Sequence, residues 1–167
     1  MTAISRRKMV ATGLIGAGAY GIASITGLFG DAQARSGKTF KINRTPAEWQ
    51  KRLGAARYRI LRGEGTERPY SSALNKEKRK GIYACAGCNL GLYSSGTKFD
   101  SGTGWPSFWA PIKGRVGTSS DHKIGYARTE VHCARCGGHQ GHIFNDGPKP
   151  TGKRHCINGL ALRFIPA

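Results

Sequence analysis

The chain has 167 residues, and its 27 Lys and Arg against 9 Asp and Glu give a formal net charge of +18. This length indicates one domain with at most a short appendage. With 38% apolar and 22% charged residues, the composition is globular and excludes wholesale disorder. The 25 glycines follow no Gly-X-Y period, which excludes collagen, and one long uncharged stretch is too few for a multi-span membrane protein.

The N-terminus has the features of an export signal. Arg6, Arg7 and Lys8 precede an uncharged stretch over residues 9–30, and a small-x-small sequence follows at residues 32–34. Paired arginines before a glycine-rich, weakly apolar segment resemble a twin-arginine signal. We therefore expect residues 1–34 to be a signal peptide and the mature protein to be periplasmic. The alternative is an uncleaved membrane anchor, because the uncharged stretch is just long enough to span a bilayer.

The basic character of the chain does not depend on the signal, because removing residues 1–34 leaves a charge of +16. Such a balance is compatible with nucleic-acid binding, but export separates a protein from nucleic acid. We therefore predict no nucleic-acid partner and membrane contact only through the signal segment. On this interpretation, the positive charge keeps the protein surface solvated or attracts acidic partners. Nothing in the sequence suggests an obligate oligomer, so we expect a monomer.

After a polar tether over residues 35–44, the sequence predicts one helix followed by short strands. Thr45, Pro46 and Glu48 form a capping-box start, and apolar residues then recur at helical spacing until a break at residues 63–65. Short runs punctuated by glycine predict strands at 81–85, 90–93, 123–131, 142–145 and 156–164. The expected fold over residues 45–167 is a mainly antiparallel β domain with a helical N-terminal flank.

Four of the five cysteines have the spacing of a metal site. Cys85 and Cys88 form one Cys-x-x-Cys pair, and Cys133 and Cys136 form a second pair after 44 intervening residues. Two such turns offer four thiolates to one Zn²⁺, and four-thiolate sites are usually structural because no coordination position stays open. The alternative in an oxidising compartment is a pair of disulfides.

The fifth cysteine, Cys156, is the candidate nucleophile. If residues 154–158 form a strand, its period of two places Arg154, Cys156 and Asn158 on one face. A guanidinium beside a thiol favours the thiolate, and an amide can stabilise a developing oxygen charge. The alternative is a small buried cysteine with a packing role.

Two histidines three residues apart, His139 and His142, are the candidate proton donors. Asp146 follows closely and can orient one of them. The alternatives are extra metal ligands or turn-stabilising polar residues. Upstream, residues 102–109 form a Gly-rich aromatic loop, in which Trp105 and Phe108 are the candidate substrate-binding residues for a methyl or thioether group. That loop can equally be a plug of the core.

Several of these motifs together resemble the type B methionine sulfoxide reductases. They are Gly-Trp-Pro-Ser-Phe (residues 104–108), the two Cys-x-x-Cys pairs, Gly-His-x-Gly-His-x-Phe-x-Asp-Gly-Pro (138–148) and Arg-x-Cys-x-Asn (154–158). The resemblance runs from about Thr45 to Phe164. It implies two antiparallel sheets, one structural zinc away from the active site, and reduction of methionine-(R)-sulfoxide in proteins or peptides.

The resemblance also implies the residue roles. Cys156 is the nucleophile that becomes a sulfenic acid, while His139, His142, Asp146, Arg154 and Asn158 line the polar side of the pocket and Trp105 packs on the substrate methyl group. Many relatives carry a recycling cysteine just before Gly-Trp-Pro-Ser-Phe, where this chain has Thr103. With no spare thiol, we expect an external, thioredoxin-fold reductant. Two rivals from other classes are a basic zinc-ribbon binding module and a thiol peroxidase.

Overall fold

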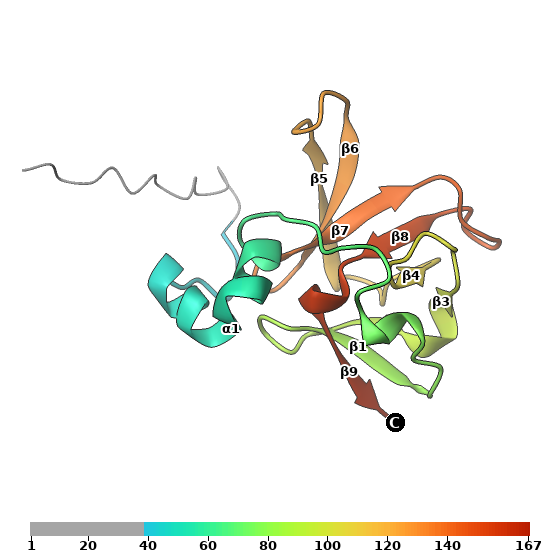
Figure 1. The fold of residues 1–167 in the computed structure, drawn as a ribbon, viewed down its shortest axis with the longest axis horizontal. Coiled ribbons are helices and arrows are strands. Elements are labelled where there is room, and N and C mark those ends of the chain that lie inside the picture. The colour runs from blue at the N-terminus through green and yellow to red at the C-terminus, as the bar shows by residue number, and fades with distance from the viewer. Residues whose placement is uncertain (1–38) are drawn as a thin grey trace, which may run out of the picture. The chain divides into compact units, whose positions relative to one another are not determined.

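The computed structural model describes residues 39–167, drawn in Figure 1. The predicted signal peptide over residues 1–34 and the first four residues of the predicted tether lie outside the described residues. The elements, in chain order, are α1 (Pro46–Leu61), η1 (Ala73–Asn75), β1 (Gly81–Cys85), β2 (Gly91–Ser94), η2 (Ser95–Thr97), β3 (Lys98–Phe99), β4 (Ser107–Phe108), β5 (Val116–Asp121), β6 (Arg128–Cys133), β7 (His139–Phe144), β8 (Arg154–Ile157), η3 (Gly159–Ala161) and β9 (Leu162–Pro166), where η marks a short 3-10 helix.

The strands form two antiparallel sheets, as predicted. A three-stranded sheet has the order β2-β1-β9, and a six-stranded sheet has the order β3-β4-β8-β7-β6-β5. In Figure 1 the hairpin of β5 and β6 rises from the larger sheet, while β1 and β9 lie below β7 and β8. This arrangement places β8, the strand of Cys156, in the interior of the larger sheet between β4 and β7.

Aromatic side chains from both sheets form the centre of the core. The ring of Phe108 in β4 stacks on Tyr93 at a centroid distance of 4.3 Å and meets Tyr83 edge-on at 4.9 Å. All three residues are fully buried. Because Tyr83 and Tyr93 belong to the smaller sheet, these contacts fix one sheet against the other; aromatic pairs of this kind contribute about 0.5–1.5 kcal/mol each beyond burial of their area.

The helix begins as the sequence predicts but is not continuous. The Thr45 side chain accepts from the Glu48 N–H, and Glu48 returns a bond to the Thr45 N–H at 2.8 Å, which completes the capping box. The prediction of one unbroken helix is wrong at Gly54, whose φ of 69° and ψ of 166° interrupt α1. That backbone region is almost exclusive to glycine. Trp49 and Leu53 before the break, and Ile60 and Leu61 after it, are all buried in the core.

Three of the strand predictions need correction, and the first is the strand predicted at 142–145, which is β7 and begins three residues earlier at His139. The strand predicted at 123–131 begins only at Arg128, because residues before it form the turn of the β5–β6 hairpin. The strand predicted at 156–164 is two strands, β8 and β9, which belong to different sheets and are separated by η3. Strands β3, β4 and β5 were not predicted. Two of them have only two residues, and β5 (Val-Gly-Thr-Ser-Ser-Asp) lacks alternating apolar side chains.

Within residues 39–167, no helix has the length and apolar character needed to cross a bilayer.

Candidate active site and metal centre

Strand β8 presents Cys156 to the same face of the sheet as a histidine of the neighbouring strand. In the antiparallel register of β7 and β8, Cys156 lies directly opposite His142, and Arg154 lies opposite Phe144. Side chains of directly opposed residues share a face of the sheet. The alternation predicted for residues 154–158 is therefore present, and His155 points the other way, into the core beside Tyr93.

Cys156 opens into a cavity of about 140 Å³. This volume is well above the about 10–15 Å³ that a cavity needs to hold one water molecule, and it suits the end of one side chain. Its lining combines an aromatic wall with a polar one and consists of Thr66, Trp105, Arg128, Gly141, His142, Phe144, Cys156 and Asn158. Four of the predicted site residues thus meet at one cavity: Cys156, His142, Asn158 and Trp105.

His142 is held by a carboxylate that the sequence analysis did not identify. Its Nε2 lies 2.7 Å from Oδ2 of Asp121, which also accepts from Nη2 of Arg128 at 2.6 Å. Burial raises the pKa of Asp121, but hydrogen bonds from Lys123, His142 and Arg128 outweigh burial and lower that pKa to about 2. An ionised carboxylate only accepts, so Nε2 of His142 carries a proton and Nδ1 is the basic nitrogen of the neutral ring.

The pKa of His142 is lowered, chiefly because burial disfavours the charged imidazolium. The hydrogen bond to Asp121 acts in the opposite direction, while the charges of Arg128 and His139 add to the lowering. His142 is therefore neutral at pH 7. Such a ring can accept a proton from a neighbouring thiol before it donates one.

The second predicted histidine, His139, lies behind His142 and outside the cavity lining. It is buried, its ring meets that of His142 edge-on at 5.3 Å, and its Nδ1 lies 2.8 Å from Oε1 of Glu130. Glu130 is a second carboxylate that the sequence analysis missed; its other oxygen accepts from the Ser119 hydroxyl. The site therefore contains two histidine–carboxylate pairs, of which only His142 reaches the cavity.

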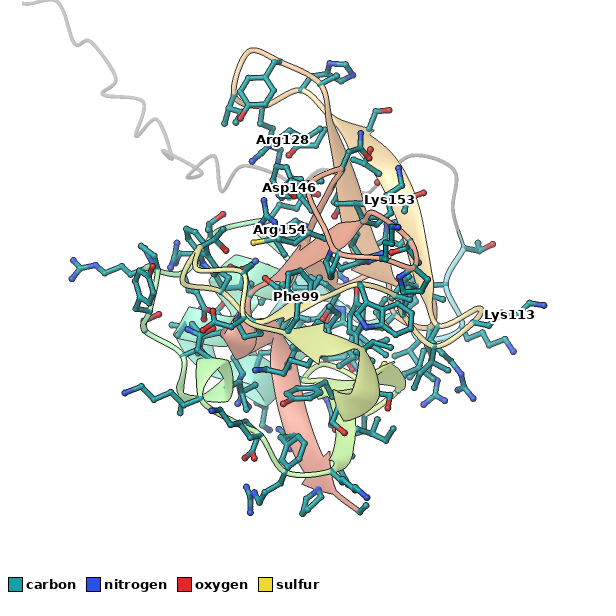
Figure 2. The ribbon with its side chains drawn as sticks, turned by 90° about the vertical axis from the view of Figure 1, so that its right-hand side faces the viewer. Phe99, Lys113, Arg128, Asp146, Lys153 and Arg154 are labelled. Carbon is teal, nitrogen blue, oxygen red and sulfur yellow. The ribbon has the colours of Figure 1, made fainter. Side chains whose placement is uncertain are left out.

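Asp146 pairs with Arg154, and neither histidine is its partner. Its two oxygens accept from Nε and Nη2 of Arg154 at 2.9 and 2.8 Å, and the guanidinium lies 4.4 Å from the centre of the Phe144 ring. Arg128, Asp146 and Arg154 are labelled in the upper half of Figure 2. This bidentate pair lowers the pKa of Asp146 and fixes the orientation of Arg154 beside Cys156.

Burial is the largest influence on Cys156 and raises the pKa of its thiol. The charge of Arg154 and a hydrogen bond from Thr103 lower it, but they do not offset burial. The effect of Arg154 has the direction expected from the sequence, since its charge favours the thiolate, but burial outweighs it. With a pKa above the ordinary cysteine value, Cys156 needs a proton acceptor to act as a nucleophile near pH 7.

The remaining polar wall is positioned by the segment around Glu67. The Asn158 side chain accepts from the Glu67 N–H at 2.9 Å and donates to the Gln140 carbonyl at 3.1 Å. Trp105 donates from Nε1 to the Glu67 carbonyl at 3.2 Å. The buried Glu67 carboxylate accepts from the N–H groups of Gly159 and Leu160. Glu67 thus orients an amide and an indole of the cavity together.

Phe108 lies apart from the cavity. It was proposed as a substrate-binding residue, but its ring belongs to the aromatic core described above and is fully buried. Trp105 and Phe144 are the aromatic residues that line the cavity instead. Within the Gly-rich loop, Phe108 therefore has the position of a core residue. Trp105 has the position expected of a substrate-binding residue.

The four remaining cysteines form a compact metal centre. Their sulfur atoms all lie within 4.8 Å of one another, and two of the separations are 3.5 Å (Cys88–Cys133) and 3.7 Å (Cys85–Cys136). A tetrahedron with Zn–S bonds of about 2.3 Å has S–S edges of about 3.8 Å. All four residues are buried and no disulfide links them. These positions fit one structural zinc ion.

Two residues of the site, Asp121 and Arg128, come from strands that the sequence pattern does not predict or places wrongly. Asp121 ends β5 and Arg128 begins β6, and the two face each other in the sheet register. The signal that could have found Asp121 is the pairing of β5 with β6, which places this carboxylate opposite Arg128, a residue of the cavity lining. Thr66 lies in a loop, in which no local pattern distinguishes it.

The fold and the site together define a class: a small two-sheet β protein with a four-thiolate metal centre and a separate cavity containing a thiol and an imidazole. A model of the SelR domain matches residues 53–166. The chain is 50% identical over 126 residues to the peptide methionine sulfoxide reductase MsrB of Leptospira interrogans, covering 75% of this chain and 96% of the relative.

Two further relatives agree. The chain is 49% identical over 127 residues to the MsrB protein of Agrobacterium fabrum, with 75% of this chain and 94% of that protein covered. It is 51% identical over 124 residues to the MsrB protein of Methanosarcina barkeri, with 74% and 87% covered. The chain therefore belongs to the SelR domain family. Its relatives in this family are named peptide methionine sulfoxide reductases of the MsrB type.

Proposed function

We propose that this chain reduces methionine-(R)-sulfoxide in proteins or peptides to methionine, with Cys156 as the nucleophile. The observation that carries the proposal is the cavity of about 140 Å³ in which Cys156 and His142 face an indole, that of Trp105. An indole is a good partner for a methyl or thioether group, and a thiol beside an imidazole has the parts of an activated nucleophile. The identity to MsrB proteins supports the same activity.

In this proposal His142 acts first as a base and then as an acid. Neutral His142 takes the Cys156 proton, and the thiolate attacks the sulfoxide sulfur. Ionised Asp121, at 2.7 Å, stabilises the imidazolium that forms. The imidazolium returns the proton to the sulfoxide oxygen. The protonated oxygen then moves to the Cys156 sulfur, which breaks both the substrate S–O bond and the S–S bond formed in the attack, and the products are methionine and a Cys156 sulfenic acid.

Recycling of that sulfenic acid requires two external thiols. Thr103 occupies the place at which many relatives carry a recycling cysteine, and the four other cysteines belong to the metal centre. The first external thiol displaces water and forms a mixed disulfide with Cys156. The second releases Cys156 as a thiol and leaves the reductant as a disulfide. A thioredoxin-fold protein is the class of reductant we propose.

Separated R and S sulfoxides test the activity directly. With dithiothreitol as reductant, the wild-type chain should reduce N-acetyl-methionine-(R)-sulfoxide and leave the S epimer unchanged. Cys156→Ser should abolish turnover while it retains the metal. Undiminished reduction by Cys156→Ser, or a preference for hydrogen peroxide over the sulfoxide, would refute the proposal.

Mass spectrometry after one turnover without reductant tests the recycling step. The proposal predicts one added oxygen atom on Cys156, trapped by dimedone as a sulfenic acid adduct. A stable intramolecular disulfide that includes Cys156 would instead show that a second thiol of this chain serves as the resolving group.

Export by the twin-arginine route remains a proposal based on residues 1–34, with a periplasmic mature protein as its consequence. Replacing Arg6 and Arg7 by Lys should lower the periplasmic yield in a bacterial host with this pathway. Replacing Lys8 by Arg is the matched control and should leave export intact. An unchanged periplasmic yield of the twin-lysine variant would exclude the route.

A further inference from the structure

A second cavity, of about 250 Å³, adjoins the first at Trp105. It shares this indole with the Cys156 cavity, and the two other aromatic rings in its lining are those of Tyr70 and Phe99. Its charged lining residues are two cations, Lys76 and Lys98, and one carboxylate, Asp100, so that the cations outnumber the acidic group. In the view of Figure 2, Phe99 lies below Arg154, and Lys113 marks the edge of the molecule. We call this second cavity the flanking pocket.

The wall between the two cavities is held by hydrogen bonds. The Gly104 carbonyl accepts from the Tyr70 N–H at 2.7 Å and from Nδ2 of Asn75 at 2.9 Å, and the Tyr70 hydroxyl donates to the Gly102 carbonyl at 2.5 Å. Gly104 has a φ of +91°, and a Cβ there would lie 2.8 Å from Cβ of Pro69. The chain preceding Trp105 therefore packs closely against the segment of Tyr70, so the pocket is preformed rather than a gap between mobile loops.

Lys98 presents an incompletely satisfied ammonium to the flanking pocket. Its Nζ donates to the Asn75 carbonyl at 2.9 Å, and the described residues place no carboxylate within 4.0 Å of it. An ammonium has three N–H donors. Partial burial lowers the pKa of Lys98, although the charges of Asp100 and Glu77 act against that lowering. An anion bound beside Nζ would supply the acceptors that water supplies poorly in a half-buried position.

We propose that the flanking pocket binds an acidic side chain located within two residues of the methionine sulfoxide in a peptide substrate. The inference rests on the proposed function. Neighbouring residues of an extended peptide are separated by about 3.3–3.6 Å, so a residue one or two positions away reaches the opposite side of the Trp105 indole. The carboxylate of Glu or Asp then pairs with Lys98, and its methylene groups contact the aromatic walls.

Blocked pentapeptides with a central methionine-(R)-sulfoxide test this inference. A single Glu or Gln is placed at each of the four flanking positions in an alanine background, and kcat/KM is measured for every peptide. For at least one position the kcat/KM of the Glu peptide should exceed that of its Gln counterpart by about two-fold to five-fold, the range that ion pairs near the protein surface contribute. Lys98→Met should reduce this ratio to about one, and Lys98→Arg should restore most of it.

Lys113→Met is the matched control, since Lys113 is exposed and lines neither cavity. It should leave the Glu-to-Gln ratio unchanged. The ratio is internal to each variant, so it does not depend on the folded fraction. A ratio near one for the wild type at all four positions, or a ratio that survives in Lys98→Met, would overturn the inference. A third peptide series carries Phe at the same four positions; a larger kcat/KM for Phe than for Glu peptides would overturn the inference and assign the pocket to aromatic side chains.

N-acetyl-methionine-(R)-sulfoxide separates this inference from the proposed function, because it has no flanking side chain. Lys98→Met should reduce it as well as the wild type does. If the wild type reduces this small substrate but shows no peptide preference, only the flanking pocket is refuted. If the wild type does not reduce it, the proposed function itself fails.

Discussion

At the scale of single residues, the reactivity of the site depends on groups that oppose the effect of burial. Burial raises the pKa of Cys156 and lowers the pKa of His142, and both shifts favour the neutral thiol and imidazole. Arg154 acts against the first shift and Asp121 against the second. These two residues therefore tune the proton transfer on which the proposed reaction depends.

Replacement of Asp121 by Asn tests its role as a positioning residue. The hydrogen bond that His142 donates to Asp121 raises the pKa of His142, so its loss should lower that pKa further. Because neutral His142 is the proposed base, the acidic limb of the kcat/KM profile should move to lower pH, and kcat should fall by about 10-fold to 100-fold. Asp146→Asn, which removes the partner of Arg154, should leave this limb in place. An acidic limb that moves only in Asp146→Asn would identify Asp146 as the orienting carboxylate.

Replacement of Arg154 by Met tests the electrostatic influence on Cys156. The charge of Arg154 lowers the pKa of the thiol, so its removal should raise that pKa and shift the pH dependence of alkylation by iodoacetamide to higher pH. Arg154→Lys keeps the charge but loses the bidentate pair with Asp146. This variant should shift the pH dependence of alkylation less than Arg154→Met does. Equal alkylation profiles for the wild type and Arg154→Met would show that burial alone sets the thiol pKa.

At the scale of elements, the sequence predicts those features that depend on neighbours in the chain. The capping box at Thr45 and the common face of Arg154 and Cys156 follow from local spacing, and both are present. The contribution of Asp121 depends on pairing of β5 with β6, and β5 has no apolar alternation because one of its faces carries small polar side chains. Phe108 belongs to the same short motif as Trp105, but its ring packs in the core and does not line the cavity. The local pattern alone could not separate these two positions.

The break in α1 predicts an unusual response to a helix-favouring substitution. In a continuous helix, Gly→Ala stabilises by about 1 kcal/mol. Gly54 instead has φ of 69° and ψ of 166°, a region that costs an alanine about 1–3 kcal/mol. Gly54→Ala should therefore lower the free energy of unfolding in urea. Gly96→Ala is the control, because Gly96 is exposed, has no positive φ and has room for a Cβ. A stabilised Gly54→Ala variant would mean that α1 is continuous in solution.

At the scale of the whole molecule, the metal centre joins the two sheets. Cys85 and Cys88 lie at the turn between β1 and β2 of the smaller sheet, and Cys133 and Cys136 lie at the turn between β6 and β7 of the larger one. A zinc ion bound by all four thiolates therefore crosslinks segments about 50 residues apart in the chain. Strand β7 carries both candidate histidines of the site, and its first residue, His139, follows Cys136 by three residues. The same crosslink therefore anchors the strand of these histidines.

This connectivity predicts that loss of the metal disrupts the fold before it affects the chemistry. Cys85→Ser removes one ligand and leaves three buried thiols without a full coordination shell. Because structural zinc contributes folding free energy directly, this variant should lower the midpoint of thermal unfolding by more than about 10 °C. Cys156→Ser is the matched control: it replaces a cysteine outside the centre and should keep one zinc per chain and a wild-type midpoint. Elemental analysis and calorimetry measure both quantities. A Cys85→Ser variant with a wild-type midpoint and full activity would contradict the structural role, because the two sheets would then be held together by the aromatic core alone.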